Sequence, residues 1–278
     1  MEVAQGSVGA PWDTLFDTGG PCGFIYRGQR EGRHAEVLVG VLFPSRDAVG
    51  RRFPFTVYAA LPLGVFAAAP HCVPYVAGAF ADAAYAVAAQ ARTLRDGAGL
   101  EALVARIAAP SVARLEPGRA EYAAWLEQEP LGVFAGRLLG AQHPEIFVGA
   151  LSALAEAIRP MRGEEASRSR LALRLPVGAP RALACTFWQD AVRQSARWRK
   201  VVPTSFWSLG EDLGSMLVQL GETPDGTLSE LWAPRPEADH VCDIGLMSGP
   251  ASVVPSLAPH ARFDASIPMA LQTLATMG

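Results

Sequence analysis

Two apolar runs joined by a short polar turn, within residues 36–61, constrain the fold of this chain more than any other stretch. The first run, Val37–Phe43, is rich in β-branched residues and is followed by Pro44. This pattern is typical of a buried strand that ends at the proline. A second apolar run occupies residues 53–61. The stretch therefore predicts a core hairpin of two strands joined by a tight polar turn.

The turn between these runs carries the polar residues of the unit. Ser45 is expected to cap a single helical turn, with Asp47 near the positive end of that turn and Gly50 closing it. Arg51 and Arg52 follow directly. Their guanidinium groups suit a phosphate or a carboxylate. The simpler interpretation is that both side chains face water or pair with Asp47.

Helical periodicity dominates the middle of the chain, from about residue 75 to 158. Apolar residues recur there at spacings of three and four, which is typical of one face of a helix. The predicted helices cover residues 75–95, 100–109, 119–127, 131–139 and 144–158.

The remainder reads as strand, helix, strand, strand and short helix, followed by a Pro-, Ser- and Ala-rich tail. The last short helix is expected to begin with a capping box over Thr227–Glu230. Ser266 could cap a terminal helix. We predict an α/β fold, mainly an antiparallel sheet flanked by helices, with two α/β halves joined by the helical middle. The expected divisions are 1–160, 161–245 and an extension over 246–278.

Composition excludes several classes of partner. The formal net charge is −3 and charged residues make up 18% of the chain, which argues against a nucleic-acid-binding surface. The N-terminal residues lack the pattern of a signal peptide, and no apolar stretch reaches the roughly 20 unbroken residues of a membrane span. The sequence predicts a cytoplasmic protein without membrane insertion.

The cysteines and histidines do not suggest a cofactor or a metal. Cys22, Cys72, Cys185 and Cys242 lie far apart and form no CxxC pair, so we expect buried free thiols. The nearest approach to a metal cluster is His240–Asp243. The favoured interpretation of that segment is the end of a strand or loop.

No local motif in the sequence indicates an enzyme, so a catalytic site would have to be assembled from residues far apart in the chain. The chain contains no Walker loop, GxGxxG, HExxH or GxSxG pattern. Asp190 could act as a general base, although the solvated face of a helix is the commoner role for such a residue. Two alternatives stay open: a hydrolase with a spatially assembled site, and a small-molecule sensor whose halves enclose an apolar cavity. Trp188, Trp207 and Trp232 could form an aromatic platform, but core packing is favoured for at least two of them.

The stretch Gly40–Phe55, read as GVLFPSRDAVGRRFPF, resembles a segment of the TagF (ImpM) family of type VI secretion accessory proteins. The shared positions are Pro44, Ser45, Asp47, Val49, Gly50, Arg51, Phe53 and Pro54. The Phe187-Trp188 helix, the Phe206-Trp207 strand and residues 214–232 are similar to the second half of that family.

This resemblance implies a regulatory protein rather than an enzyme. Members of the family are understood to repress assembly of the secretion apparatus after translation, by binding its forkhead-associated scaffold protein. We therefore expect a binding protein without catalytic residues, metal or cofactor. The expected partner contact comprises Ser45, Asp47, Arg51 and Arg52.

Overall fold

The computed structural model describes residues 16–17, 19–27, 36–47, 49–91, 97–140, 144–163, 169–210, 213–224, 226–233, 238–247, 253–262 and 264–277. Within these segments a seven-stranded sheet has the order β3-β2-β1-β5-β6-β4-β7. All neighbouring strands are antiparallel except β4 and β7, which run parallel. The strands are β1 (Cys22–Arg27), β2 (Glu36–Arg46), β3 (Arg52–Pro62), β4 (Ala172–Val177), β5 (Ser205–Ser208), β6 (Gly214–Gln219) and β7 (Val241–Asp243). The predicted α/β class with a mainly antiparallel sheet is confirmed.

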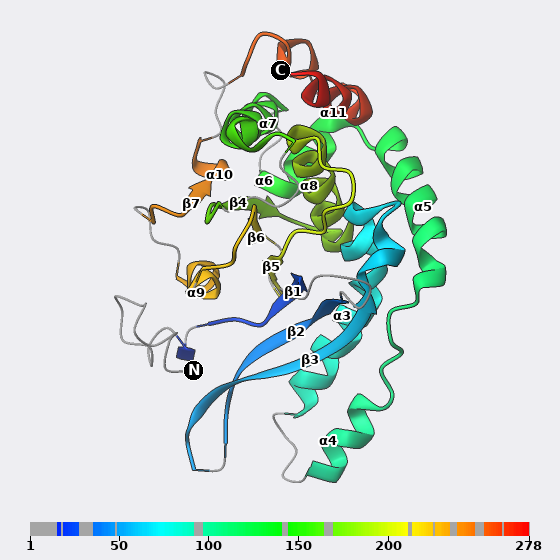
Figure 1. Ribbon diagram of the computed structural model, residues 1–278, viewed down its shortest axis with the longest axis vertical. Helices are drawn as coiled ribbons and strands as arrows, with labels where there is room; N and C mark the ends of the chain where they lie inside the picture. The colour runs from blue at the N-terminus through cyan, green and yellow to red at the C-terminus, as the bar shows by residue number, and fades with distance from the viewer. Residues whose placement is uncertain are drawn as a thin grey trace.

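Helices surround this sheet, and Figure 1 shows α3 lying behind the long β2–β3 hairpin. The α-helices are α3 (Val73–Ala91), α4 (Gly97–Val104), α5 (Leu115–Gln128), α6 (Leu131–Leu139), α7 (Pro144–Ile158), α8 (Arg181–Ala196), α9 (Thr227–Trp232), α10 (Ile244–Met247) and α11 (Ile267–Thr276). Short 3-10 turns are η1 (Leu63–Phe66), η2 (Pro70–Cys72), η3 (Val112–Arg114), η4 (Arg159–Met161) and η6 (Ala258–His260).

The two predicted strands of residues 36–61 form the hairpin β2–β3. Val37, Val39 and Val41 are fully buried, and Tyr85 of α3 stacks on Phe43 with ring centroids 5.9 Å apart. The expectation that Pro44 ends the first strand is wrong, because β2 continues to Arg46. Pro44 lies beyond Leu42, the last β2 residue with a β1 partner. Its missing N–H therefore costs no hydrogen bond of the ladder.

The helical middle follows the sequence pattern closely. Helices α6 and α7 have the predicted bounds, and Phe134 and Phe147 from them are buried. The Phe134 ring meets Phe187 of α8 edge-on with centroids 4.8 Å apart, an arrangement that aromatic rings prefer, and the Phe147 ring meets it tilted at 5.5 Å. By length and composition alone, the helical segment Pro70–Ala91 could cross a membrane, but half of its apolar 18-residue stretch is buried in the fold.

Trp188 and Trp207 pack into the core, which confirms the favoured interpretation of the tryptophans. Gly23 of β1 lies opposite Trp207 of β5, and a Cβ on Gly23 would come within 2.2 Å of the indole ring. A glycine at this position thus lets the ring lie flat across the β1–β5 junction. This junction joins strands from the first two predicted divisions of the chain in one sheet; the proposed boundaries themselves stay predictions.

The predicted capping box at the start of α9 is wrong. Gly226 is the N-cap, and the hydroxyls of Thr227 and Ser229 donate to carbonyl oxygens of the preceding turn. The Glu230 carboxylate instead lies 3.5 Å from the guanidinium of Arg174, and both side chains are buried. A buried arginine on the neighbouring strand β4 is a stronger partner for this carboxylate than a backbone N–H at the helix start.

The tail contributes to the core. Ser266 accepts a hydrogen bond from the Met269 N–H and caps α11, as predicted. Ile267, Leu271 and Leu274 of that helix are buried, and α11 packs against α8. The His240–Asp243 segment contains β7, which agrees with the strand interpretation.

Candidate functional site

The tip of the β2–β3 hairpin projects beyond the rest of the sheet. Each strand has 11 residues, but β1 pairs with β2 only as far as Leu42. The cross-strand pairs from Phe43–Phe55 to Arg46–Arg52 therefore extend past the end of β1. Figure 1 shows this tip at the lower left, on the side of the molecule away from α11. Beyond Leu42 the edge of β2 is therefore not covered by β1.

The turn at the tip is organised by Asp47. Its carboxylate accepts hydrogen bonds from the N–H groups of Val49 (3.1 Å) and Arg51 (2.8 Å), while its own N–H donates to the Arg51 carbonyl (3.1 Å). Gly50 has a φ of 82°, the left-handed conformation that glycine adopts without steric cost. Asp47 thus performs the role that the sequence analysis assigned to Ser45.

Ser45 lies in strand β2 opposite Phe53, so the expectation that it caps a helical turn is wrong. Extended pairing continues on both strands up to Arg46 and Arg52, which leaves only the residues from Asp47 to Arg51 for the turn. A turn of this length closes through the Asp47 side chain rather than through a turn of helix.

Arg51 and Arg52 point to different partners. The Arg51 guanidinium donates to Asp47 Oδ2 at 2.6 Å, and its side chain is 80% exposed. Partial burial acts to raise the pKa of Asp47, but the hydrogen bonds from Arg51 and Val49 outweigh it and the pKa is lowered. The interpretation that the arginines pair with Asp47 thus holds for Arg51, whereas Arg52 reaches Asp17.

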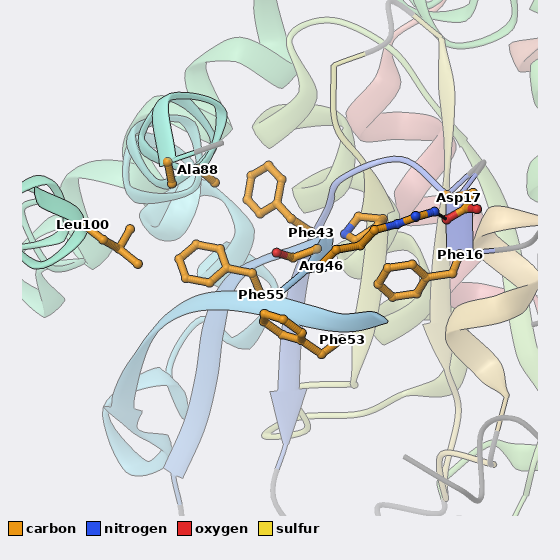
Figure 2. A pocket seen from close by; sticks show the side chains of 12 residues that line it. Phe16, Asp17, Phe43, Arg46, Phe53, Phe55, Ala88 and Leu100 are labelled. Atoms are coloured by element: carbon orange, nitrogen blue, oxygen red, sulfur yellow. Dashed lines mark hydrogen bonds and ion pairs between the residues drawn. The ribbon is translucent and has the colours of Figure 1, made fainter. Parts of the chain in front are cut away.

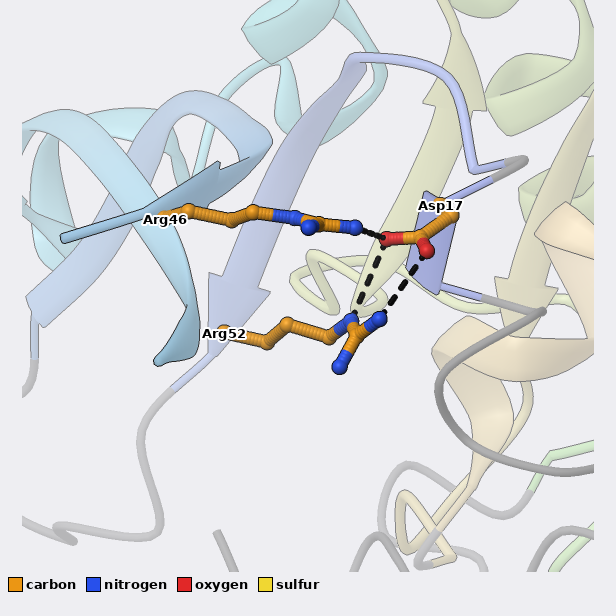
Figure 3. A network of polar contacts seen from close by, with 3 residues as sticks. All are labelled: Asp17, Arg46 and Arg52. Atoms are coloured by element: carbon orange, nitrogen blue, oxygen red, sulfur yellow. Dashed lines mark hydrogen bonds and ion pairs between the residues drawn. The ribbon is translucent and has the colours of Figure 1, made fainter. Parts of the chain in front are cut away.

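Arg52 and Arg46 hold the carboxylate of Asp17 together (Figure 3). Asp17 Oδ1 accepts from Arg46 Nη2 and from Arg52 Nε (3.2 Å), and Oδ2 accepts from Arg52 Nη2 (3.0 Å). These hydrogen bonds, first from Arg52 and then from Arg46, lower the pKa of Asp17 from 3.8 to about 2. We call Arg46 and Arg52 the arginine fork.

An open groove of about 630 Å³ lies beside the fork, between the hairpin and helices α3 and α4. Figure 2 shows the rings of Phe43, Phe53 and Phe55 between Leu100 at one end and Arg46 with Asp17 at the other. The groove therefore has an aromatic wall and a charged end. Its lining belongs to the first part of the chain, so it is not the cavity between two halves that the sensor alternative requires.

The hairpin tip contains the four residues that the sequence analysis proposed as a partner contact, together with Arg46 and Asp17, which it did not name. Ser45 lines the groove, Asp47 and Arg51 form the turn, and Arg52 belongs to the fork. Arg46 lies beyond Pro44, where the sequence pattern ended the strand, so its position opposite Arg52 follows from the hairpin register. Asp17 carries no local signal, since its partners are 29 and 35 residues away.

The other candidate residues have structural surroundings. Asp190 is buried, not on a solvated helix face: it accepts from Tyr122 (3.2 Å), Arg193 (2.6 Å) and Gln194 (3.1 Å). All four cysteines are free, and burial raises the pKa of Cys22 to about 12, which suppresses the thiolate form. Within the described segments, no group of three or more His, Cys, Asp or Glu residues could hold a metal ion.

The fold and this tip define the class: a mixed α/β sheet domain with a long hairpin that carries charged residues beside an aromatic groove. Residues 1–109 match the sequence model of the family described as "TagF N-terminal domain, Type VI secretion system-associated". This part of the chain, which includes the whole β2–β3 hairpin, is therefore a TagF N-terminal domain. The resemblance inferred from Gly40–Phe55 is confirmed there, whereas the similarity of residues 187–232 lies outside the matched part.

The chain was also compared with curated protein sequences and with solved structures. No curated protein sequence matches the chain. Among solved structures, the chain is similar to PA0076 from Pseudomonas aeruginosa PAO1, with 17% sequence identity and a TM-score of 0.42. That similarity covers 85% of this chain and 80% of the other.

Proposed function

We propose that this protein is a non-enzymatic, cytoplasmic regulator of type VI secretion that represses assembly of the apparatus after translation. It does so by binding the forkhead-associated scaffold protein of the system. The observation that carries this proposal is the TagF N-terminal domain over residues 1–109, a type VI secretion-associated family.

The hairpin tip is the proposed contact surface. It lies inside the matched residues, and Arg51 is 80% exposed at its end. Ser45, Asp47, Arg51 and Arg52 are the proposed partner-binding residues. Arginine supports such a role because its planar, multi-donor head group forms specific contacts with acidic groups of a partner.

Co-purification from the native bacterium tests the partner. The tagged full-length protein is expected to recover the forkhead-associated protein, and Arg51→Ala plus Arg52→Ala is expected to reduce that recovery. Arg119→Ala plus Arg159→Ala is the control, because both arginines are exposed and pair with glutamates away from the hairpin. If the unmutated protein recovers no forkhead-associated protein, the proposed partner is wrong.

Secretion itself tests the repressor role. Deletion of the gene is expected to raise the amount of secreted apparatus components in the medium while their transcript levels stay constant. Unchanged secretion, or a change that follows the transcripts, would contradict repression after translation. Fractionation of the same cells checks the cytoplasmic location.

A further inference from the structure

Arg46 and Arg52 are direct cross-strand neighbours. The Asp47 N–H bonds to the Arg51 carbonyl, so residues 47 and 51 are a hydrogen-bonded pair of the hairpin. The next pair, Arg46 and Arg52, is then a non-hydrogen-bonded pair, in which side chains lie closest together on one face. Two like charges in this position repel each other unless an anion lies between them. The fork is thus built around an anion.

The chain fills the fork with its own carboxylate. Asp17 makes three hydrogen bonds to the two arginines, including a two-point contact with Arg52. This geometry is the one in which a guanidinium recognises a carboxylate best. The structure therefore displays the chemistry that the fork binds.

Asp17 is nevertheless easy to displace. Its side chain is 39% exposed, and those of Arg46 and Arg52 are 50% and 25% exposed. Exposed ion pairs contribute little net stability, because water competes for both partners. Phe16, the preceding residue, is anchored separately: it is 2% exposed and packs edge-on against Trp232. The Asp17 side chain could thus turn to solvent while the backbone beside it stays in place.

The groove next to the fork can accept an apolar group. Phe53 and Phe55 from β3 and Leu100 from α4 line it, and Arg46 lies at its charged end. A volume of about 630 Å³ is in the range of pockets that bind small ligands and side chains. An acidic residue held by the fork would place an adjacent side chain at the mouth of this groove.

We propose that the hairpin tip binds an acidic–apolar segment of a partner protein, whose carboxylate replaces Asp17 in the fork and whose neighbouring apolar side chain enters the groove. Asp17 acts as an internal competitor that weakens this binding. The inference deepens the proposed function, on which its biological meaning rests, by naming the chemistry of the partner segment.

Fluorescence anisotropy with a labelled synthetic peptide tests the site on the purified full chain. The probe is the peptide Thr-Leu-Phe-Asp-Thr-Gly-Gly, the sequence of residues 14–20, which carries the Phe-Asp pair already seen at the hairpin. Asp17→Asn is expected to bind the probe about tenfold more tightly than the unmutated protein, since one charge-assisted contact no longer competes. Adding Arg52→Gln is expected to remove this gain, and Arg119→Gln to leave it unchanged.

Two outcomes overturn the inference. One is equal affinity of the Asp17→Asn variant and the unmutated protein. The other is equal binding of a probe in which Asn replaces its Asp. A measurement on the unmutated protein guards against a folding defect: the Nε–H NMR signals of Arg46 and Arg52 are expected to shift when the probe is added. Absent shifts also overturn the site.

This experiment separates the site from the named partner. If the probe binds as expected but no forkhead-associated protein is co-purified, the acidic–apolar site stands and the proposed function falls. If the forkhead-associated protein is recovered but the probe does not bind, the proposed function stands and the site falls.

Discussion

The buried arginine of β4 offers a quantitative test of the reasoning behind the fold. Arg174 donates from Nη1 to Asp243 Oδ2 (2.9 Å) and from Nη2 to the Glu230 carbonyl (3.0 Å), and the Glu230 carboxylate lies 3.5 Å away. The side chains of Arg174 and Glu230 are 7% and 0% exposed. This network joins α9 and β7 to β4, the strand next to β7 in the sheet.

Replacing Arg174 with Met keeps an apolar stem of similar length but removes the cation. The formal charge of the three side chains changes from −1 to −2, and one of the two carboxylates is fully buried. Removing one partner from a buried ion pair typically costs about 3–5 kcal/mol, because the remaining charge loses its compensation. We therefore expect Arg174→Met to lower the free energy of unfolding by about 3–5 kcal/mol.

Urea denaturation followed by circular dichroism measures this loss. Arg159→Met is the matched control: Arg159 lies 3.0 Å from Glu156, but both side chains are exposed, so its loss is expected to cost less than about 1 kcal/mol. Glu230→Gln in the Arg174→Met background is expected to recover part of the stability, with a coupling of about 0.5–3 kcal/mol. If Arg174→Met costs no more than Arg159→Met, the network is not a stabilising element and the reasoning fails.

Three further predictions concern the hairpin tip, the β3 edge and a helix end. Val57→Pro removes a buried side chain and a bonded N–H of the β2–β3 ladder, so we expect it to lower the free energy of unfolding by about 3 kcal/mol. The N–H of Tyr58 faces away from β2, so Tyr58→Pro is expected to lower it by about 1 kcal/mol or less. Equal losses in urea denaturation would contradict the hydrogen-bonding register. The pKa of Asp17 is lowered, so its stabilising contribution is complete above its ordinary value of 3.8 and is lost as pH falls toward about 2. An NMR titration of the Asp17 carboxyl carbon should then show a midpoint near about 2, and a midpoint near 3.8 would refute the fork. Arg197 at the C-cap of α8 has a φ of 57°, a left-handed conformation that is strained for residues other than glycine. Arg197→Gly is therefore expected to raise the free energy of unfolding by about 0.5–1 kcal/mol, whereas Arg197→Ala is not. No gain with glycine in urea denaturation would contradict this local strain.

Local pattern determined the secondary elements of this protein to a large extent. The alternation and β-branched content of residues 37–43 predicted β2, and the three- and four-residue spacings predicted α6 and α7 with the observed bounds. Such elements are predictable because each buries one face, and the period of the apolar residues reports which face that is. The turn was harder, since Ser45 and Asp47 are both good capping residues and only the strand register decides between them.

Local sequence is therefore enough to predict the hairpin, the helical middle, the free thiols and the TagF-like motif around Asp47 and Arg51. Tertiary structure alone decided that Arg52 binds Asp17, 35 residues away, and that Glu230 faces Arg174, 56 residues away, instead of its own helix start. Each of these choices depends on which charged groups the sheet order brings together and how far water is excluded from them. Ion pairs gain strength from that proximity and burial, and neither quantity is encoded in the spacing of residues along the chain.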